Sequence, residues 1–185
     1  MRGPTSPDPG DNWLLMRKIR FEPLDERHLE DVRALVADPD VLHYTRIPEP
    51  PPDDFAGSWI AAYATARKDG TREGFAAIDG DGRFVGLGLA PTIDRKAGEL
   101  ELGYIVPAWA RGRGVASEIL RLMTIWALGE VGAMRVYLII DVENRASERV
   151  AERCGYVREG VMRSIHVKQG RRADAALWSR LPSDP

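Results

Sequence analysis

The chain contains few of the residues that form disulfides or metal sites. Its single cysteine is Cys154, and its three histidines, His28, His43 and His166, are far apart in the sequence. A lone cysteine excludes an internal disulfide and a cysteine-rich zinc site, and scattered histidines do not match the spacing of a histidine metal site. We therefore predict no metal ion, place Cys154 in the core, and expect the cytoplasm as the compartment.

Long hydrophobic runs and an excess of one charge are also missing. No apolar segment approaches the ~20 residues of a transmembrane helix, and the first residues lack the hydrophobic stretch of a signal peptide. The formal net charge of −2 argues against a protein held on nucleic acid by general phosphate attraction. The expectation is a soluble protein with no membrane or nucleic-acid partner, in which any anion site is a local cluster of charge.

The domain organisation follows from length and composition. With 185 residues, the chain is long enough for one domain with a sizeable core. The Pro-, Gly- and Asp-rich start predicts a mobile tail over 1–15. The remainder, 16–185, contains neither an internal repeat nor a linker and is predicted to form a single domain.

Hydrophobic periodicity predicts the element order β-α-α-β-β-β-α-β-α-β-β. The hairpin signal around 80–82 favours an antiparallel first half of the sheet. A strand at 99–106, a helix at 116–128 and a strand at 135–142 predict a right-handed parallel crossover, and the continuous apolar run of the last strand is typical of burial on both faces. The predicted fold class is α/β, a mixed sheet of about seven strands with helices on both faces.

The stretch "RGRGVASE", residues 111–118, lies between an expected strand and an expected helix. A helix N-terminus leaves backbone N–H groups unpaired and attracts anions, and Gly112 and Gly114 allow close approach of the backbone. Arg111 and Arg113 can add positive charge. A Walker A loop is excluded because its lysine is absent, and a Rossmann fingerprint lacks its third glycine. Taken alone, the loop is either a binding site for a nucleotide or another phosphate ligand, or a plain turn.

Two motifs at a fixed distance narrow these alternatives. Arg111, Gly114 and Ala116 fill the pattern [QR]-x-x-G-x-[GA], and about thirty residues later the chain reads N-x-x-S-x-x-V-x-x-x-x-G-[YF] from Asn144 to Tyr156. With this element order, the chain resembles the GNAT superfamily of acetyl-CoA-dependent N-acyltransferases. It is most similar to the branch that contains ribosomal-protein N-terminal acetyltransferases.

The resemblance implies acetyl-CoA as a co-substrate, held where a parallel pair of strands splays apart. The strand backbone would bind the pantetheine arm, the loop would bind the pyrophosphate, and Ser117 would open the following helix. Asn144 would reach the pantetheine or cap its own helix, and both roles are compatible. The implied cofactor-binding residues are Tyr104, Ile105, Val106, Arg111, Gly112, Arg113, Gly114, Val115, Ala116, Ser117 and Asn144.

The implied chemistry is direct attack of an amine on the thioester, without a covalent enzyme intermediate. Ser147 is the candidate acid or hydrogen-bond donor to the thiolate, or it bonds only to backbone, and Tyr156 is a weaker candidate. Glu99 and Glu101, on one face of a strand, are candidate bases or solvated charges. His166 lies near a glutamate position of the resembling branch and is a further candidate base.

The acceptor is the least determined part of the prediction. A Pro-rich stretch at 48–52, with Trp59 and Tyr63 in the next helix, is expected to flank the acceptor groove. A protein N-terminus and a small amine both remain open as acceptors, and a non-catalytic acyl-CoA-binding module is the alternative function. The closing hairpin is a plausible homodimer contact.

Overall fold

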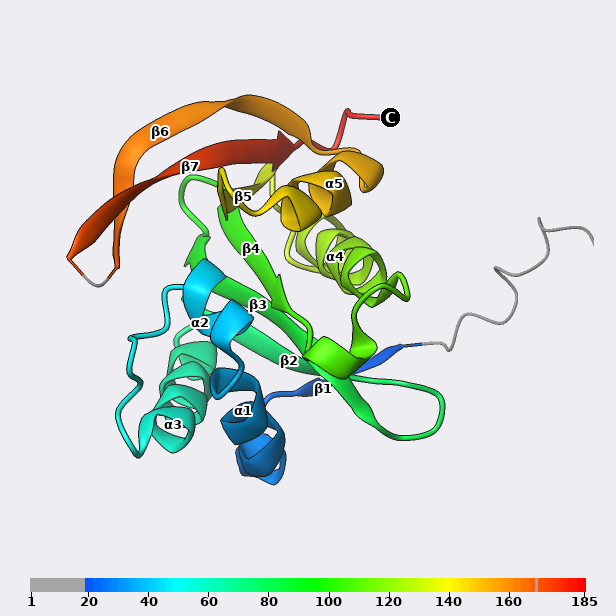
Figure 1. Cartoon of the computed structure of the whole chain (residues 1–185). Helices are drawn as coiled ribbons and strands as arrows, with labels where there is room; N and C mark the ends of the chain where they lie inside the picture. The colour runs from blue at the N-terminus through cyan, green and yellow to red at the C-terminus, as the bar shows by residue number, and fades with distance from the viewer. Residues whose placement is uncertain (1–18, 169) are drawn as a thin grey trace, which may run out of the picture.

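The computed structural model describes residues 19–168 and 170–185, so the tail predicted over 1–15 lies outside the described residues. Seven strands form one mixed sheet, as predicted, and their order is β1-β2-β3-β4-β5-β7-β6 (Figure 1). The β4–β5 pair is parallel, and every other neighbouring pair is antiparallel. The strands are β1 (Arg20–Pro23), β2 (Glu73–Ile78), β3 (Phe84–Asp94), β4 (Glu99–Ile105), β5 (Arg135–Asp141), β6 (Val157–Lys168) and β7 (Arg171–Arg180).

Helices cover both faces of the sheet, as predicted (Figure 1). On one face lie α1 (Leu29–Val36), α2 (Pro39–Tyr44) and α3 (Phe55–Lys68), whose apolar residues pack with Leu87, Leu89 and Ile105. On the other face, α4 (Val115–Ile125) and α5 (Arg145–Arg153) pack on Leu100 and Leu102. Leu100 and Leu102 thus face α4, whereas Ile105 faces α1 and α3, as the alternation of side chains along a strand requires.

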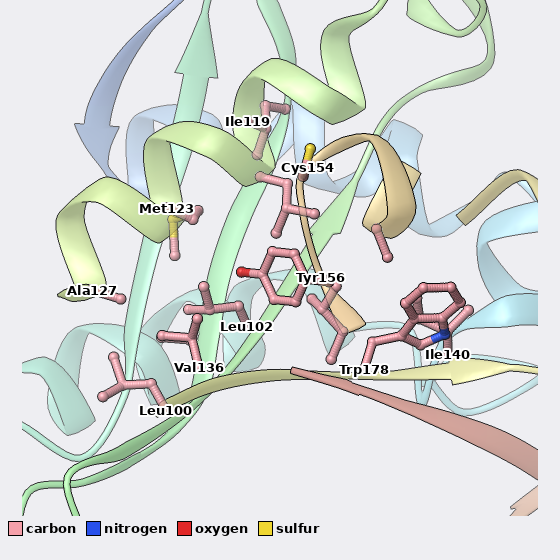
Figure 2. Close-up of a cluster of buried hydrophobic side chains, with 14 of the residues drawn as sticks. Leu100, Leu102, Ile119, Met123, Ala127, Val136, Ile140, Cys154, Tyr156 and Trp178 are labelled. Carbon is pink, nitrogen blue, oxygen red and sulfur yellow. The ribbon is translucent and has the colours of Figure 1, made fainter. Parts of the chain in front are cut away.

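The core between the sheet and α4 contains two residues that the sequence singled out. Figure 2 shows Cys154 and Tyr156 among apolar side chains of β4, α4 and β5. Cys154 is buried, as predicted, and burial raises the pKa of its thiol. The Tyr156 hydroxyl lies 2.7 Å from the Thr124 hydroxyl inside this core. Tyr156 is therefore a packing residue of this core.

Two local predictions are corrected. The expected helix at 116–128 ends at Ile125 and continues as one π-helical turn, Trp126–Glu130. The short helix α2 was not predicted, although Asp38 caps it through the Asp40 amide and Pro39 occupies its first turn. Cap and proline are recognisable N-terminal signals, but six residues carry too little periodicity to identify a helix.

Strand β5 also departs from the prediction of burial on both faces. Its buried residues alternate with half-buried ones, among them Ile139 and Asp141. Both of these line a cleft, so this side of β5 is only partly covered. An apolar residue at a cleft wall and one in a core look alike in sequence, which explains the error.

The parallel pair β4–β5 is joined over a short length. Pairing connects Glu99, Leu100 and Glu101 with Arg135, Val136 and Tyr137, and β4 then continues to Ile105 without a β5 partner. The strands therefore separate toward their carboxyl ends, which confirms the predicted splay.

Strand β6 forms the outer edge of the sheet. It carries exposed Val161, Ile165 and Val167, with 44%, 48% and 62% of their surface accessible. A homodimer contact through this hairpin stays a prediction. Over the described residues, no helix combines the length and apolar composition of a membrane span.

Candidate active site

A cleft of about 1860 Å³ opens where β4 and β5 separate. Its walls come from α2 and α3 on one side and from the start of α4 and from α5 on the other. The β6–β7 hairpin borders the same cleft through residues that include His166. Most of the residues connected with function from the sequence therefore line one space, whereas Glu99 and Arg113 lie outside its lining.

The start of α4 presents bare backbone to this cleft. Gly112 and Gly114 both adopt positive φ angles, +74° and +79°, and a Cβ atom built at Gly112 would meet no other atom within 4 Å. Helix α4 then begins at Val115 with no side-chain cap. The amides of Val115, Ala116 and Ser117 have no carbonyl of a preceding turn to bind, so this end of the helix suits an anion.

The two loop arginines do not present free charge to the cleft. Arg111 Nη2 donates to Asp38 at 2.6 Å, its Nη1 donates to Asp40 at 2.7 Å, and its Nε donates to the Val106 carbonyl at 3.0 Å. Arg111 thus fastens the loop to the N-terminus of α2. Arg113 is exposed and lies outside the cleft lining.

Six other arginines line the cleft and were not identified from the sequence. Arg46 and Arg72 are two of them, and the other four lie on α5 and β7. Arg149 and Arg153 lie one turn apart on α5, and Arg171 and Arg172 lie at the start of β7. The spacing of four on α5 was a usable signal, because such residues share a helix face. The positive charge that this cleft presents therefore comes from arginines outside the loop.

A pair of hydroxyl groups lies at the inner end of the cleft. The Tyr104 hydroxyl is 2.6 Å from Ser147 Oγ, and the Ser147 amide donates to Asn144 Oδ1 at 3.0 Å. Burial raises the pKa of Tyr104 well above its ordinary value, so the phenol is protonated at neutral pH. Asn144 is the cap of α5, as predicted. Ser147 was predicted from the sequence and Tyr104 was expected to act only through its backbone, so their hydroxyl contact was not predicted.

The two candidate carboxylates of β4 have different surroundings. Glu101 is buried, lines the cleft and forms an ion pair with Arg46. Glu99 is nearly half exposed, lies outside the cleft lining and approaches Arg135 Nε at 4.0 Å. Both sit on the face of β4 opposite Leu100, as predicted, but only Glu101 faces the cleft.

His166 lies on β6 after an interruption of the ladder. The β6–β7 register shifts between Met162 and His166, and Ser164 there adopts a φ of 56°. The Ser164 amide donates to Asp174 Oδ1 at 2.8 Å, which supports the irregular turn of the strand. His166 is partly buried and lines the cleft.

The expected acceptor wall also borders the cleft. Pro48, Phe55, Trp59 and Tyr63 all line it, and the Phe55 and Trp59 rings stack with centroids 5.8 Å apart. Over residues 19–168 and 170–185, no group of three or more His, Cys, Asp and Glu side chains is placed to hold a metal ion.

Comparison with known proteins decides the family. The profile of the acetyltransferase (GNAT) domain matches residues 18–157. The chain belongs to the GNAT acetyltransferase family. It is an N-acetyltransferase, in agreement with the resemblance found in its motifs.

Relatives of this GNAT enzyme match over most of its length. The N-acetyltransferase YoaA of Bacillus subtilis is 25% identical over 169 residues, covering 90% of this chain and 92% of the relative. The L-amino acid N-acetyltransferase AaaT of Escherichia coli is 28% identical over 171 residues, covering 90% and 99%.

Solved GNAT structures have the same fold. The ribosomal L7/L12 α-N-protein acetyltransferase RimL, in complex with coenzyme A, superposes with a TM-score of 0.80 at 20% identity, covering 88% of this chain and 93% of that one. The spermidine N-acetyltransferase of Vibrio cholerae, in complex with CoA and spermine, superposes with a TM-score of 0.79 at 20% identity, covering 90% and 96%.

Proposed function

We propose that this acetyltransferase transfers an acetyl group, or another short acyl group, from acyl-CoA to a primary amine bound in the cleft. The observation that carries the proposal is the convergence of three features on one space. These are the uncapped start of α4, the Tyr104–Ser147 hydroxyl pair and the buried Glu101. The first suits a pyrophosphate, and the other two suit proton transfer at a thiolate and at an amine.

The donor half of the cleft fits coenzyme A in two ways. The loop Gly112–Ser117 offers backbone N–H groups to the pyrophosphate, and glycine at 112 keeps the approach open. The β5-facing backbone of Tyr104, Ile105 and Val106 lies beyond the last β4–β5 pair. It has no β5 partner and can bind the amide-containing pantetheine arm, except at the Val106 carbonyl, which accepts from Arg111 Nε. Arg149 and Arg153 add positive charge for the phosphates.

The reaction forms a C–N bond and breaks the C–S bond of the thioester. The amine must lose a proton, and the departing thiolate must gain one. Tyr104 stays protonated, so one hydroxyl of the Tyr104–Ser147 pair donates within the pair and the other hydrogen points outward. We assign this outward hydroxyl hydrogen to the thiolate. The acyl group is already activated in the thioester, and positioning supplies a large part of the remaining rate.

The amine approaches from the opposite face of β4. Glu101 lies on that face with the acceptor wall of α3, whereas Tyr104 points to α5. The strand thus separates the group that takes a proton from the group that gives one. Glu101 is the proposed base or ammonium-binding group, and His166, across the cleft on β6, is the second candidate.

The proposal is tested by release of free CoA thiol from acetyl-CoA with a panel of amines. Ser147→Ala lowers the rate by about 100-fold, as expected for loss of general acid catalysis. Tyr156→Phe is the matched control, because it removes a hydroxyl–hydroxyl contact of similar length, 2.7 Å to Thr124, outside the cleft. Its rate stays at the wild-type value.

Two outcomes would contradict this assignment. Equal rates in Ser147→Ala and wild type would remove the hydroxyl pair from the mechanism. A rise in melting temperature with acetyl-CoA, together with no thiol release for any amine, would favour a non-catalytic acyl-CoA-binding module. His166→Ala measured beside Glu101→Gln identifies which of the two side chains the amine requires.

A further inference from the structure

The acceptor side of the cleft holds charged side chains of both signs. Glu101 is buried on β4, and its ion-pair partner Arg46 comes from the segment between α2 and α3. Arg72, directly before β2, lines the same cleft. It is exposed, and no ion pair or side-chain hydrogen bond joins it to another residue in the described part of the chain. Arg46 therefore orients the Glu101 carboxylate, and the Arg72 guanidinium is available for a ligand.

Tyr63 lines the same cleft as Arg46 and Arg72. Burial raises the pKa of Tyr63 to about 12, and the positive charges of Arg72 and Arg46 act against that rise. Both arginines are thus close enough to influence the same phenol. Its ring packs edge-on against Trp59 at 5.6 Å, and among the described residues its hydroxyl has no hydrogen-bond partner. Arg72 and Tyr63 together offer N–H and O–H donors to an anion.

Space for an amine lies beside Glu101. Gly103 is two residues further along β4, on the same face, and a Cβ built there would meet no other atom within 4 Å. Gly103 also lines the cleft close to the point where β5 leaves β4. A small polar group above Gly103 thus lies next to the Glu101 carboxylate and beside the strand backbone assigned to the acyl donor.

We propose that the acceptor is a free α-amino acid with an apolar side chain. Glu101 receives its ammonium group above Gly103, and Arg72, Arg46 and the Tyr63 hydroxyl receive its carboxylate. The stacked rings of Phe55 and Trp59 contact its side chain. This inference rests on the proposed function and names the substrate class of the same site.

Charge argues against the other acceptor classes. A polyamine brings several positive charges beside Arg72, the guanidinium that no carboxylate of the described residues neutralises, and like charges repel. A peptide N-terminus has a neutral amide where an amino acid has its carboxylate, and it leaves Arg72 without an anionic partner. A carboxylate–arginine contact is a charge-assisted, often bidentate hydrogen bond and discriminates strongly.

The experiment compares L-leucine with L-leucinamide, spermidine and a leucyl dipeptide by thiol release in the full chain. In wild type, kcat/KM for leucine exceeds that for leucinamide by about 10- to 100-fold, the value of a hydrogen bond to a charged group. In Arg72→Gln this ratio falls at least tenfold because only the leucine rate decreases. Comparing the ratio between enzymes cancels the different basicities of the two amines. Arg83→Gln, an exposed arginine in the β2–β3 turn, keeps the wild-type ratio.

Three results overturn the inference. They are equal or higher kcat/KM for spermidine or the dipeptide, equal kcat/KM for leucine and leucinamide, and an equal loss of both rates in Arg72→Gln. Each leaves thiol release intact, so the proposed acetyl transfer survives while the acceptor class does not. Absence of thiol release with every amine overturns the proposed function itself.

Discussion

The Tyr104 hydroxyl and Ser147 Oγ lie 2.6 Å apart and join β4 to α5 across the inner end of the cleft. The Asn144 side chain accepts from the Ser147 amide and so fixes the serine from the other side. Strand, helix and cap therefore position one hydroxyl pair. Tyr104 is held in its protonated form by burial, and Ser147 is held in place by the start of its helix.

Because the two hydroxyls act as a unit, their removal is not additive. Tyr104→Phe and Ser147→Ala each lower kcat, and the double variant loses no more than about the larger single loss. KM for acetyl-CoA changes little, since neither hydroxyl belongs to the proposed pyrophosphate site. Steady-state kinetics of the four proteins checks this. A loss of kcat in the double variant equal to the product of the two single losses would show that the groups act independently.

Filling the space above Gly103 interferes with the acceptor. The residue lies in a regular strand, so Gly103→Ala keeps the fold, and its methyl group enters the volume assigned to the amine. KM for the acceptor rises about tenfold, while the affinity for acetyl-CoA, measured by calorimetry, stays unchanged. Gly160→Ala on β6 is the matched control, because a Cβ also meets no atom within 4 Å there. An unaltered acceptor KM in Gly103→Ala would place the amine elsewhere.

Arg111 connects the donor loop with the acceptor wall through Asp38. We expect the pair to contribute about 1 kcal/mol to the free energy of unfolding, because its exposure limits the effect. A double-mutant cycle with Arg111→Gln and Asp38→Asn, measured by urea denaturation, gives this coupling. The same cycle with Arg113→Gln in place of Arg111→Gln gives no coupling energy. A coupling near zero for Arg111 would mean that the ion pair does not hold α2 to the loop.

The ionisation of Glu159 makes the free energy of unfolding depend on pH. Its carboxylate binds Arg135, at 2.6 Å and 2.8 Å, and accepts from Ser179, and these contacts lower its pKa from 4.5 to about 2. A folded-state pKa below the unfolded value stabilises the fold above the unfolded pKa, and the stabilisation is lost as pH falls toward the folded pKa. The free energy of unfolding therefore decreases between pH 4.5 and about 2.

The variant Glu159→Gln isolates that contribution. It is less stable than wild type at pH 7, and the difference narrows as the pH falls through the same interval. Urea denaturation at several pH values measures both effects. Glu152→Gln, an exposed residue of α5, follows the wild-type curve. A constant difference between Glu159→Gln and wild type would contradict the assigned ion pair.

The element order and the sheet were predictable because they depend on local pattern. Alternating and apolar runs defined the strands, and Asn144 marked the start of α5. The relationship between Arg111 and Asp38 was not predictable, since 73 positions separate them and only the packing of α2 brings them together. Tyr104 and Ser147, 43 positions apart, met for the same reason. Local sequence identifies which residues carry chemistry, and tertiary packing decides which of them share a hydrogen bond.

Glu101 illustrates the same limit at one strand. The alternation of β4 places Glu99 and Glu101 on one face, yet only Glu101 lines the cleft. The distinction depends on where β5 stops pairing, and no residue of β4 encodes that position by itself. Pro48, Trp59 and Tyr63 line the cleft as expected, because the proline-rich segment and its helix are adjacent in the chain.

The early end of β4–β5 pairing gives the sheet an open edge in its interior. Open edges usually attract other chains, which add to them as extra strands. Here residues of α4, α5 and the β6–β7 hairpin line the cleft beside that edge. A thin, flexible molecule that carries its own amide groups, as the proposed acyl donor does, can complete the hydrogen-bonding ladder. The unpaired end of β4 thus selects a ligand by backbone hydrogen bonding, as strands select one another in a sheet.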